Sequence, residues 1–125
     1  MNKNMRIVLV EDDAALRHVL AAFFKKAGVD VLAASGDGME ALALLGSVHP
    51  DLILTDCQMP NMDGISLVRH LRARGDYTPV IMMSGQTDPS VRRMAFEAGV
   101  CEYLNKPLSL PQLNRVIGQR FGTAA

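Results

Sequence analysis

The sequence of 125 residues has no tryptophan, only two cysteines and no excess of charge of either sign. Cys57 and Cys101 do not form a metal-ligand spacing such as Cys-x-x-Cys, so we expect two free thiols in a reducing cytoplasm. The 13 basic and 13 acidic residues give a formal net charge of zero. This balance offers no electrostatic basis for binding nucleic acid or an anionic membrane.

Long apolar runs are also absent. The longest apolar stretches are far too short to cross a bilayer, and residues 1–4 lead directly into a strand pattern without the apolar region of a signal peptide. No linker, repeat or low-complexity stretch divides the chain, and its length suffices for one hydrophobic core. We therefore expect a single cytoplasmic domain over residues 1–125, without membrane insertion and without a second domain.

The sequence does contain a fivefold alternation of strand and helix patterns. Apolar runs predict strands at 5–10, 29–33, 52–55, 80–83 and 101–104. The first helix is predicted over 14–27, with its buried face formed by Leu16, Val19, Leu20, Phe23 and Ala27. The later helices are indicated by their ends: N-caps at Asp37 and Asp88, a start at Gly64, a stop at Gly99 and a first-turn proline at Pro111.

Three of the predicted strands are apolar almost throughout. The runs 7–10, 52–55 and 80–83 do not alternate, which is typical of strands in a parallel sheet that is covered by helices. Because crossovers between parallel strands are right-handed, few topologies remain. The predicted fold is α/β: a doubly wound five-stranded parallel sheet in the flavodoxin-like order 2-1-3-4-5, with helices on both faces. Its switch point, where ligands bind, lies between the first and third strands.

Polar residues stand where these strands end. Glu11 and Asp12 follow the first strand, Asp56 the third, Ser84 the fourth and Lys106 the fifth, so all five are expected at one edge of the sheet. Two carboxylates about 4 Å apart repel by roughly 4 kcal/mol at an effective dielectric constant of about 20. Such a cluster requires a proton or a cation. Oxygen ligands with room left for water and phosphate favour Mg²⁺ over Ca²⁺.

A metal ion, a lysine and a hydroxyl around a carboxylate suit a phosphoryl group on that carboxylate. Asp56 is expected to be ionised at neutral pH and needs no general base, while Lys106 and the metal neutralise charge during transfer. Taken singly, each feature has a plainer interpretation: an acidic run suits a helix N-terminus, and an isolated Asp56 or Ser84 suits a turn. Their joint occurrence at strand ends favours the phosphoryl site.

These residues lie in motifs that resemble those of response-regulator receiver domains, the phosphorelay modules of two-component signalling, including chemotaxis receivers. Residues 56–64, Asp-Cys-Gln-Met-Pro-Asn-Met-Asp-Gly, resemble the family's phosphorylation loop. The pairs 11–12, 84–85 and 106–107 resemble its acidic pair, its switch hydroxyl with a small neighbour and its lysine motif. Residues 34–42 resemble its second loop and helix, so the resemblance covers essentially the whole chain.

The resemblance implies a role for each residue of the site. Asp56 is the phosphoacceptor. Asp12, Asp56 and the backbone carbonyl of Gln58 bind Mg²⁺, with Glu11 assisting through water. Lys106 contacts the phosphoryl oxygens. No essential position departs from the family's pattern, so an active receiver rather than a degenerate one is expected.

The resemblance also implies a switch and its partners. Ser84 hydrogen-bonds the phosphoryl group and moves toward it, Tyr103 then turns inward, and the Lys106–Pro107 peptide bond is cis. The phosphoryl group comes from a phosphohistidine of a histidine kinase or a histidine phosphotransfer protein. Phosphorylation switches the face formed by the fourth helix, fifth strand and fifth helix, which contacts a downstream protein. The domain is not an enzyme beyond its own aspartyl phosphorylation and dephosphorylation.

Three alternatives differ in what they require. A receiver excised from a hybrid histidine kinase or a multidomain regulator would carry the same site, and Cys57-Gln58 resembles the loop of hybrid-kinase receivers. A haloacid-dehalogenase-type phosphatase also uses a nucleophilic Asp, Mg²⁺ and Lys, but it needs a second Asp two residues later, where Gln58 stands. A flavodoxin needs a phosphate-cradling loop after the first strand, where this chain has three carboxylates.

A docking surface is predicted on the first helix. Ala15, His18 and Ala22 recur at three- and four-residue spacing, away from the predicted buried face. They would form a low, partly apolar surface beside the acidic pocket, where the kinase or phosphotransfer partner is expected to dock. The alternative is that exposed alanines simply favour the helix.

Overall fold

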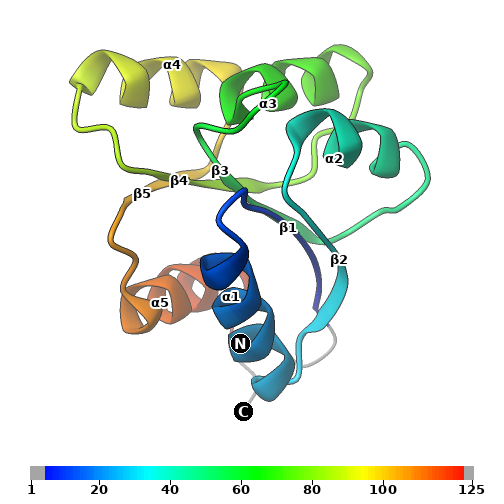
Figure 1. The fold of residues 1–125 in the computed structure, drawn as a ribbon, viewed down its shortest axis with the longest axis vertical. Helices are drawn as coiled ribbons and strands as arrows, with labels where there is room; N and C mark the ends of the chain where they lie inside the picture. The colour runs from blue at the N-terminus through cyan, green and yellow to red at the C-terminus, as the bar shows by residue number, and fades with distance from the viewer. Residues whose placement is uncertain (1–4, 123–125) are drawn as a thin grey trace.

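The computed structural model describes residues 5–122, so residues 1–4, which lead into the first predicted strand, lie outside it. Within residues 5–122, ten strands and helices alternate (Figure 1). In chain order they are β1 (Arg6–Val10), α1 (Ala14–Lys26), β2 (Asp30–Ser35), α2 (Gly38–Leu44), β3 (Leu52–Asp56), α3 (Gly64–Ala73), β4 (Val80–Ser84), α4 (Pro89–Ala98), β5 (Glu102–Asn105) and α5 (Leu110–Phe121).

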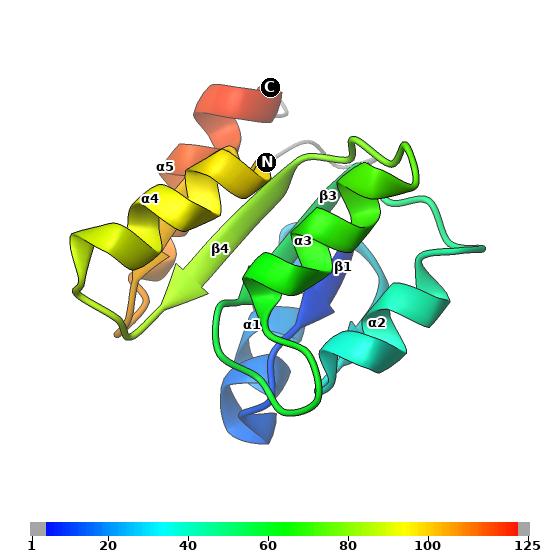
Figure 2. The same cartoon turned by 90° about the horizontal axis from the view of Figure 1, so that it is seen from above.

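The five strands form one parallel sheet in the order β2-β1-β3-β4-β5, which confirms the predicted doubly wound, flavodoxin-like fold. α1 and α5 cover one face of the sheet, and α2, α3 and α4 cover the other (Figures 1 and 2). Because every strand runs in the same direction, the ends of β1, β3, β4 and β5 lie along one edge. This edge positions the polar residues that follow the strands.

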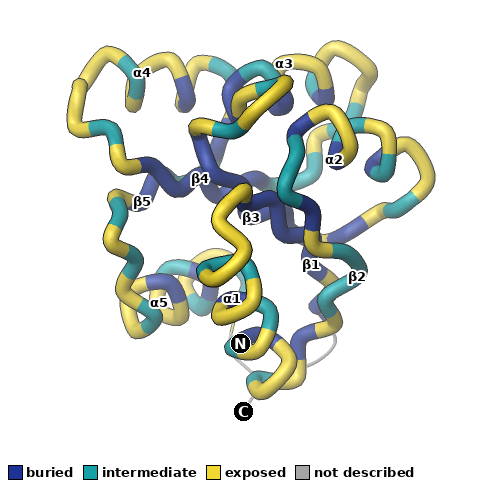
Figure 3. Tube along the Cα trace, in the orientation of Figure 1, coloured by how far each residue is buried: buried dark blue, intermediate teal, exposed yellow. Residues whose placement is uncertain are grey.

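The core lies on both faces of the central strands. Every residue of β3 and β4 is buried, as Figure 3 shows for the middle of the molecule. Val8, Ile53 and Met82 pack toward α2 and α3, whereas residues one step along each strand pack toward α1 and α5. The continuous apolar runs in the sequence therefore arise from burial on both faces of the sheet.

The predicted buried face of α1 is partly wrong. Val19 is 49% exposed, whereas Leu20 and Phe24 are fully buried. Phe23 is half-buried and packs edge-on against Phe24, with ring centroids 5.3 Å apart. Two adjacent phenylalanines allow two helical stripes, and the pattern alone does not decide which faces the sheet. The structure turns Val19 to the surface that carries Ala15, His18 and Ala22, all of which are exposed.

The helix ends follow the predicted capping residues. The side chain of Asp37 accepts hydrogen bonds from the N–H groups of Met39 and Glu40, and Asp88 caps α4 in the same way. α4 ends at Gly99, whose φ of 118° lies in the left-handed region that favours glycine. β3 and β4 run one residue further than predicted, so Asp56 and Ser84 are themselves the last strand residues.

None of the helices within residues 5–122 combines the length and the apolarity that a bilayer-spanning helix needs.

The start of α3 packs tightly against the end of β3, at Gly64. A Cβ atom on Gly64 would stand 2.3 Å from the carbonyl oxygen of Asp56. Because the obstruction is backbone, we expect Gly64→Ala to lower the free energy of unfolding by about 1–3 kcal/mol in urea denaturation. Gly85→Ala is the matched control, since its Cβ would meet no atom within 4 Å. Equal midpoints for the two variants would contradict this close packing.

Candidate phosphoryl and metal site

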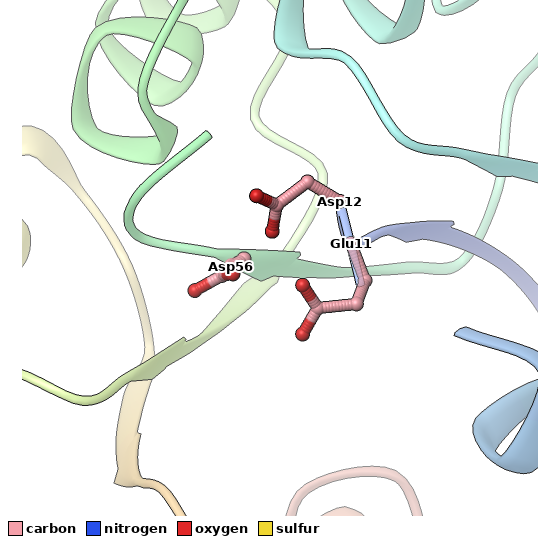
Figure 4. Close-up of side chains that lie close together, drawn as sticks. All are labelled: Glu11, Asp12 and Asp56. Atoms are coloured by element: carbon pink, nitrogen blue, oxygen red, sulfur yellow. The ribbon is translucent and has the colours of Figure 1, made fainter. Parts of the chain in front are cut away.

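Three carboxyl groups converge at the carboxyl edge of the sheet. Glu11 follows β1, Asp12 comes next, and Asp56 ends β3, the strand beside β1. Carboxylate oxygens of the three residues lie within 4.8 Å of one another (Figure 4). Glu11 and Asp56 are 1% and 5% exposed, whereas Asp12 is open to solvent. The sequence predicted this cluster from the strand order alone.

Lys106 reaches into the cluster from the end of β5. Its Nζ lies 2.6 Å from Glu11 Oε1 and 3.0 Å from Asp56 Oδ2. The backbone holds the residue in place, because its N–H donates to the Ser84 carbonyl at 2.8 Å, and its peptide bond to Pro107 is cis. One half-buried ammonium group thus contacts two buried carboxyl groups, one just after β1 and one at the end of β3.

The protonation of the site reflects its burial. Burial raises the pKa of Glu11 to about 7, the neighbouring Asp56 carboxyl adds to the rise, and Lys106 opposes it. The hydrogen bond from Glu11 holds the pKa of Asp12 below its usual value. Burial lowers the pKa of Lys106, but its contacts with Glu11 and Asp56 outweigh this and leave the pKa raised. The raised pKa of Glu11 shows that ionising the whole cluster is costly, and a further cation near these oxygens would lower that cost.

The donor set fits Mg²⁺. Carboxylate oxygens are hard ligands, and Mg²⁺ uses one or two protein carboxylates while it keeps several waters. Exposed Asp12 leaves one side of the cluster open to solvent, from which a metal ion would take its water ligands. Gln58, the residue expected to contribute a backbone carbonyl, is exposed in the loop two positions after Asp56.

Ser84, the last residue of β4, and Tyr103 of β5 are both joined to Gln86 by hydrogen bonds. The fully buried Ser84 accepts a hydrogen bond from the Gln86 N–H at 2.9 Å. The Gln86 carbonyl in turn accepts from Asn105 Nδ2 at 3.1 Å and, at 3.5 Å, from the hydroxyl of buried Tyr103. Gln86 thus links Ser84 to β5, a link that no local sequence signal indicates.

Arg17 is another residue of the site that the sequence did not single out. Its guanidinium donates a hydrogen bond to the Glu11 carbonyl at 2.7 Å, so a side chain of α1 holds the backbone of the acidic pair. A Cβ atom on Gly36 would stand 2.8 Å from the same guanidinium nitrogen. In the sequence Arg17 is an ordinary helix residue, because the reach of a long side chain depends on the tertiary structure.

The comparisons with known proteins agree with this geometry. The model of the response regulator receiver domain matches residues 7–118. Regulator of RpoS from Escherichia coli K12 is 39% identical over 111 residues, 89% of this chain and 32% of the relative. Response regulator MprA from Mycobacterium avium is 38% identical over 109 residues, 87% of this chain and 47% of the relative. The chain thus spans less than half the length of these relatives.

Two solved structures share the fold. The receiver domain of Francisella response regulator 1452 superposes with a TM-score of 0.86 at 31% identity, covering 93% of this chain and 95% of that one. The receiver domain of sensor histidine kinase PA1611 from Pseudomonas aeruginosa gives 0.85 at 30% identity, covering 96% and 99%, and holds magnesium in its active-site cleft. From its fold, its clustered carboxylates and these matches, the chain belongs to the response-regulator receiver domains of two-component signalling.

Proposed function

We propose that this receiver accepts a phosphoryl group on Asp56 from a phosphohistidine of a histidine kinase or histidine phosphotransfer protein, with Mg²⁺ as cofactor. One observation carries the proposal: Asp56 Oδ2 lies 3.0 Å from Lys106 Nζ while the carboxyl groups of Glu11 and Asp12 stand beside it. In this proposal, Asp56 acts as the nucleophile, Lys106 supplies a cation, and Glu11 and Asp12 assist the metal ion. The proposed setting is cytoplasmic.

In the proposed transfer, an Asp56 carboxylate oxygen forms the new bond to phosphorus. The bond from phosphorus to the donor's imidazole nitrogen breaks, and its electron pair stays on that nitrogen. Lys106 holds positive charge against the phosphoryl oxygens, and Ser84 donates its hydroxyl proton to one of them in a hydrogen bond. Bound Mg²⁺, held by Asp12, Asp56 and the Gln58 carbonyl with Glu11 through water, would neutralise the remaining charge.

The same residues suggest how the signal leaves the site. In this structure Ser84 accepts a hydrogen bond from the Gln86 N–H. The Gln86 carbonyl accepts hydrogen bonds from Tyr103 and Asn105 of β5. When Ser84 turns to the phosphoryl group, the N–H of Gln86, in the loop before α4, loses its hydrogen bond to Ser84. The face formed by α4, β5 and α5 then repacks around Tyr103 and presents a changed surface to a downstream protein.

A second candidate is that this receiver acts as one module of a longer regulator or hybrid kinase. The observation that favours it is length, since the chain covers 32% and 47% of the two relatives. The site chemistry is the same in both candidates. A dehalogenase-type phosphatase is disfavoured, because Gln58 offers no carboxyl group for acid–base chemistry two residues after Asp56. We therefore propose a signalling module with no separate substrate to turn over.

Phosphorylation of Asp56 tests the proposal directly. Incubation with a small phosphodonor and Mg²⁺ is expected to add one phosphoryl group, which intact-mass and peptide mass spectrometry locate on Asp56. Asp56→Asn keeps the size of the side chain but removes the nucleophilic carboxylate, so labelling is expected to vanish. Stoichiometric labelling of Asp56→Asn would contradict the assignment.

We also propose that the phosphohistidine partner docks on α1. Ala15, His18 and Ala22 are exposed, and Val19, at 49% exposure, joins them in one stripe at helical spacing. The stripe begins two residues after Asp13, the N-cap that follows the acidic pair. A helix lying along it would bring its phosphohistidine close to Asp56.

The double variant Ala15→Arg, Ala22→Arg separates docking from chemistry. Two bulky cations on the stripe are expected to slow transfer from the cognate kinase at least about tenfold, while both residues remain compatible with helix. Phosphorylation by a small-molecule donor is expected to stay at the wild-type rate. Equal loss in both assays, or no loss in either, would remove α1 from the proposed interface.

A further inference from the structure

The loop of residues 57–63, between β3 and α3, is fixed at its base by backbone hydrogen bonds. The Cys57 N–H donates to the Met83 carbonyl at 2.7 Å, and the Gly64 N–H donates to the Cys57 carbonyl at 2.7 Å. The loop carries Gln58, and its tip reaches across to the start of α2 (Figure 2). These base contacts leave the position of the tip undetermined.

Two contacts fasten the tip to α2. Asn61 Nδ2 donates a hydrogen bond to the carboxylate of Asp37, and Asn61 adopts a φ of 68°, the left-handed conformation that asparagine tolerates better than most residues. Beside it, the backbone of Met62 packs against Gly38 so closely that a Cβ atom there would stand 2.2 Å from the Met62 carbonyl oxygen. The side chain and the backbone of the tip are therefore both held by two neighbouring residues at the start of α2.

Asp37 is itself held by the end of β2. Its Oδ1 caps α2 at the Met39 N–H, which leaves Oδ2 for Asn61. The Ser35 hydroxyl accepts a hydrogen bond from the Asp37 N–H at 3.2 Å. The Ser35 carbonyl accepts one from the Glu11 N–H at 2.8 Å. A continuous path of hydrogen bonds thus runs from the acidic pair to the tip of the loop, and the bond from Asn61 helps to hold the pKa of Asp37 low.

We propose that Asp37 and Asn61 are a pair of positioning residues that hold the loop, and with it the Gln58 carbonyl, in place for Mg²⁺. This rests on the proposed function of Gln58 as a metal ligand. Neither residue belongs to the carboxylate cluster. Their effect is to pre-organise one ligand, so that metal binding does not have to order the loop.

An isosteric exchange of the two side chains provides the test. Asn61→Asp sets two carboxylates against each other, and adding Asp37→Asn restores one donor and one acceptor, while the amide oxygen introduced at position 37 can still cap α2. Asn61→Gly keeps the positive φ and removes the hydrogen bond without adding charge. Asp76→Ala is the matched control, because it breaks two side-chain hydrogen bonds to Thr78, before β4 at the opposite edge of the sheet.

Two quantities are measured: hydrogen exchange of the Met62 and Gly64 amides in metal-free protein, and the dissociation constant for Mg²⁺. Asn61→Asp and Asn61→Gly are expected to accelerate exchange and weaken Mg²⁺ binding, each by about threefold to tenfold, the range of one exposed charged hydrogen bond. The double variant Asn61→Asp, Asp37→Asn is expected to return the rate of hydrogen exchange toward that of the wild-type protein. Asp76→Ala is expected to change neither quantity.

The proposal would be overturned if both Asn61 variants kept the wild-type rates of hydrogen exchange and the wild-type affinity for Mg²⁺. It would also be overturned if the double variant did not restore the protection of these amides. Failure of the proposed function would look different. In that case wild-type protein would not bind Mg²⁺ at Asp12 and Asp56, whereas the exchange measurement in metal-free protein would still report on the tether.

Discussion

The repulsion among three carboxyl groups at one end of an apolar sheet is the constraint on which this site depends. Glu11 and Asp56 are buried at the ends of neighbouring strands, where water screens their charge poorly. Lys106 relieves part of that repulsion by bonding to both. The ammonium group lies 95 residues along the chain from Glu11, so only the completed sheet brings it there. In the proposed function, a divalent cation at this edge would relieve the remaining repulsion.

The surrounding structure keeps these groups from moving apart. Arg17 fixes the backbone after β1, the Ser84 carbonyl fixes Lys106, and Gly64 lets α3 begin directly against Asp56. These contacts use backbone atoms, which do not change with protonation or with metal. The backbone of Gln86 is instead bonded to the hydroxyl groups of Ser84 and Tyr103, which can rotate to other partners. We relate the first set of contacts to the proposed phosphoryl transfer and the hydroxyl contacts to the proposed switch.

Much of this arrangement was predictable from the sequence. Apolar runs located the strands, their lack of alternation gave a buried parallel sheet, and the strand order then placed Glu11, Asp56 and Lys106 together. The register of α1 was not predictable, because Phe23 and Phe24 offer two equivalent stripes. Arg17 and Asn61 were missed for another reason: their partners, the Glu11 carbonyl and the Asp37 carboxylate, are set by tertiary structure. The local signal in the sequence was the residue type, because asparagine tolerates the positive φ that Asn61 adopts.

The proposed function requires that the carboxylate cluster bind Mg²⁺. The direct measurement is the melting temperature of wild-type protein and of Asp12→Ala as Mg²⁺ is added. At about a hundredfold excess over the dissociation constant, a ligand of the folded state adds about 2.7 kcal/mol of stability. We expect the wild-type melting temperature to rise with Mg²⁺ and that of Asp12→Ala to stay nearly constant over the same range. A wild-type melting temperature that does not change with Mg²⁺, or an equal rise in Asp12→Ala, would contradict metal binding at this cluster.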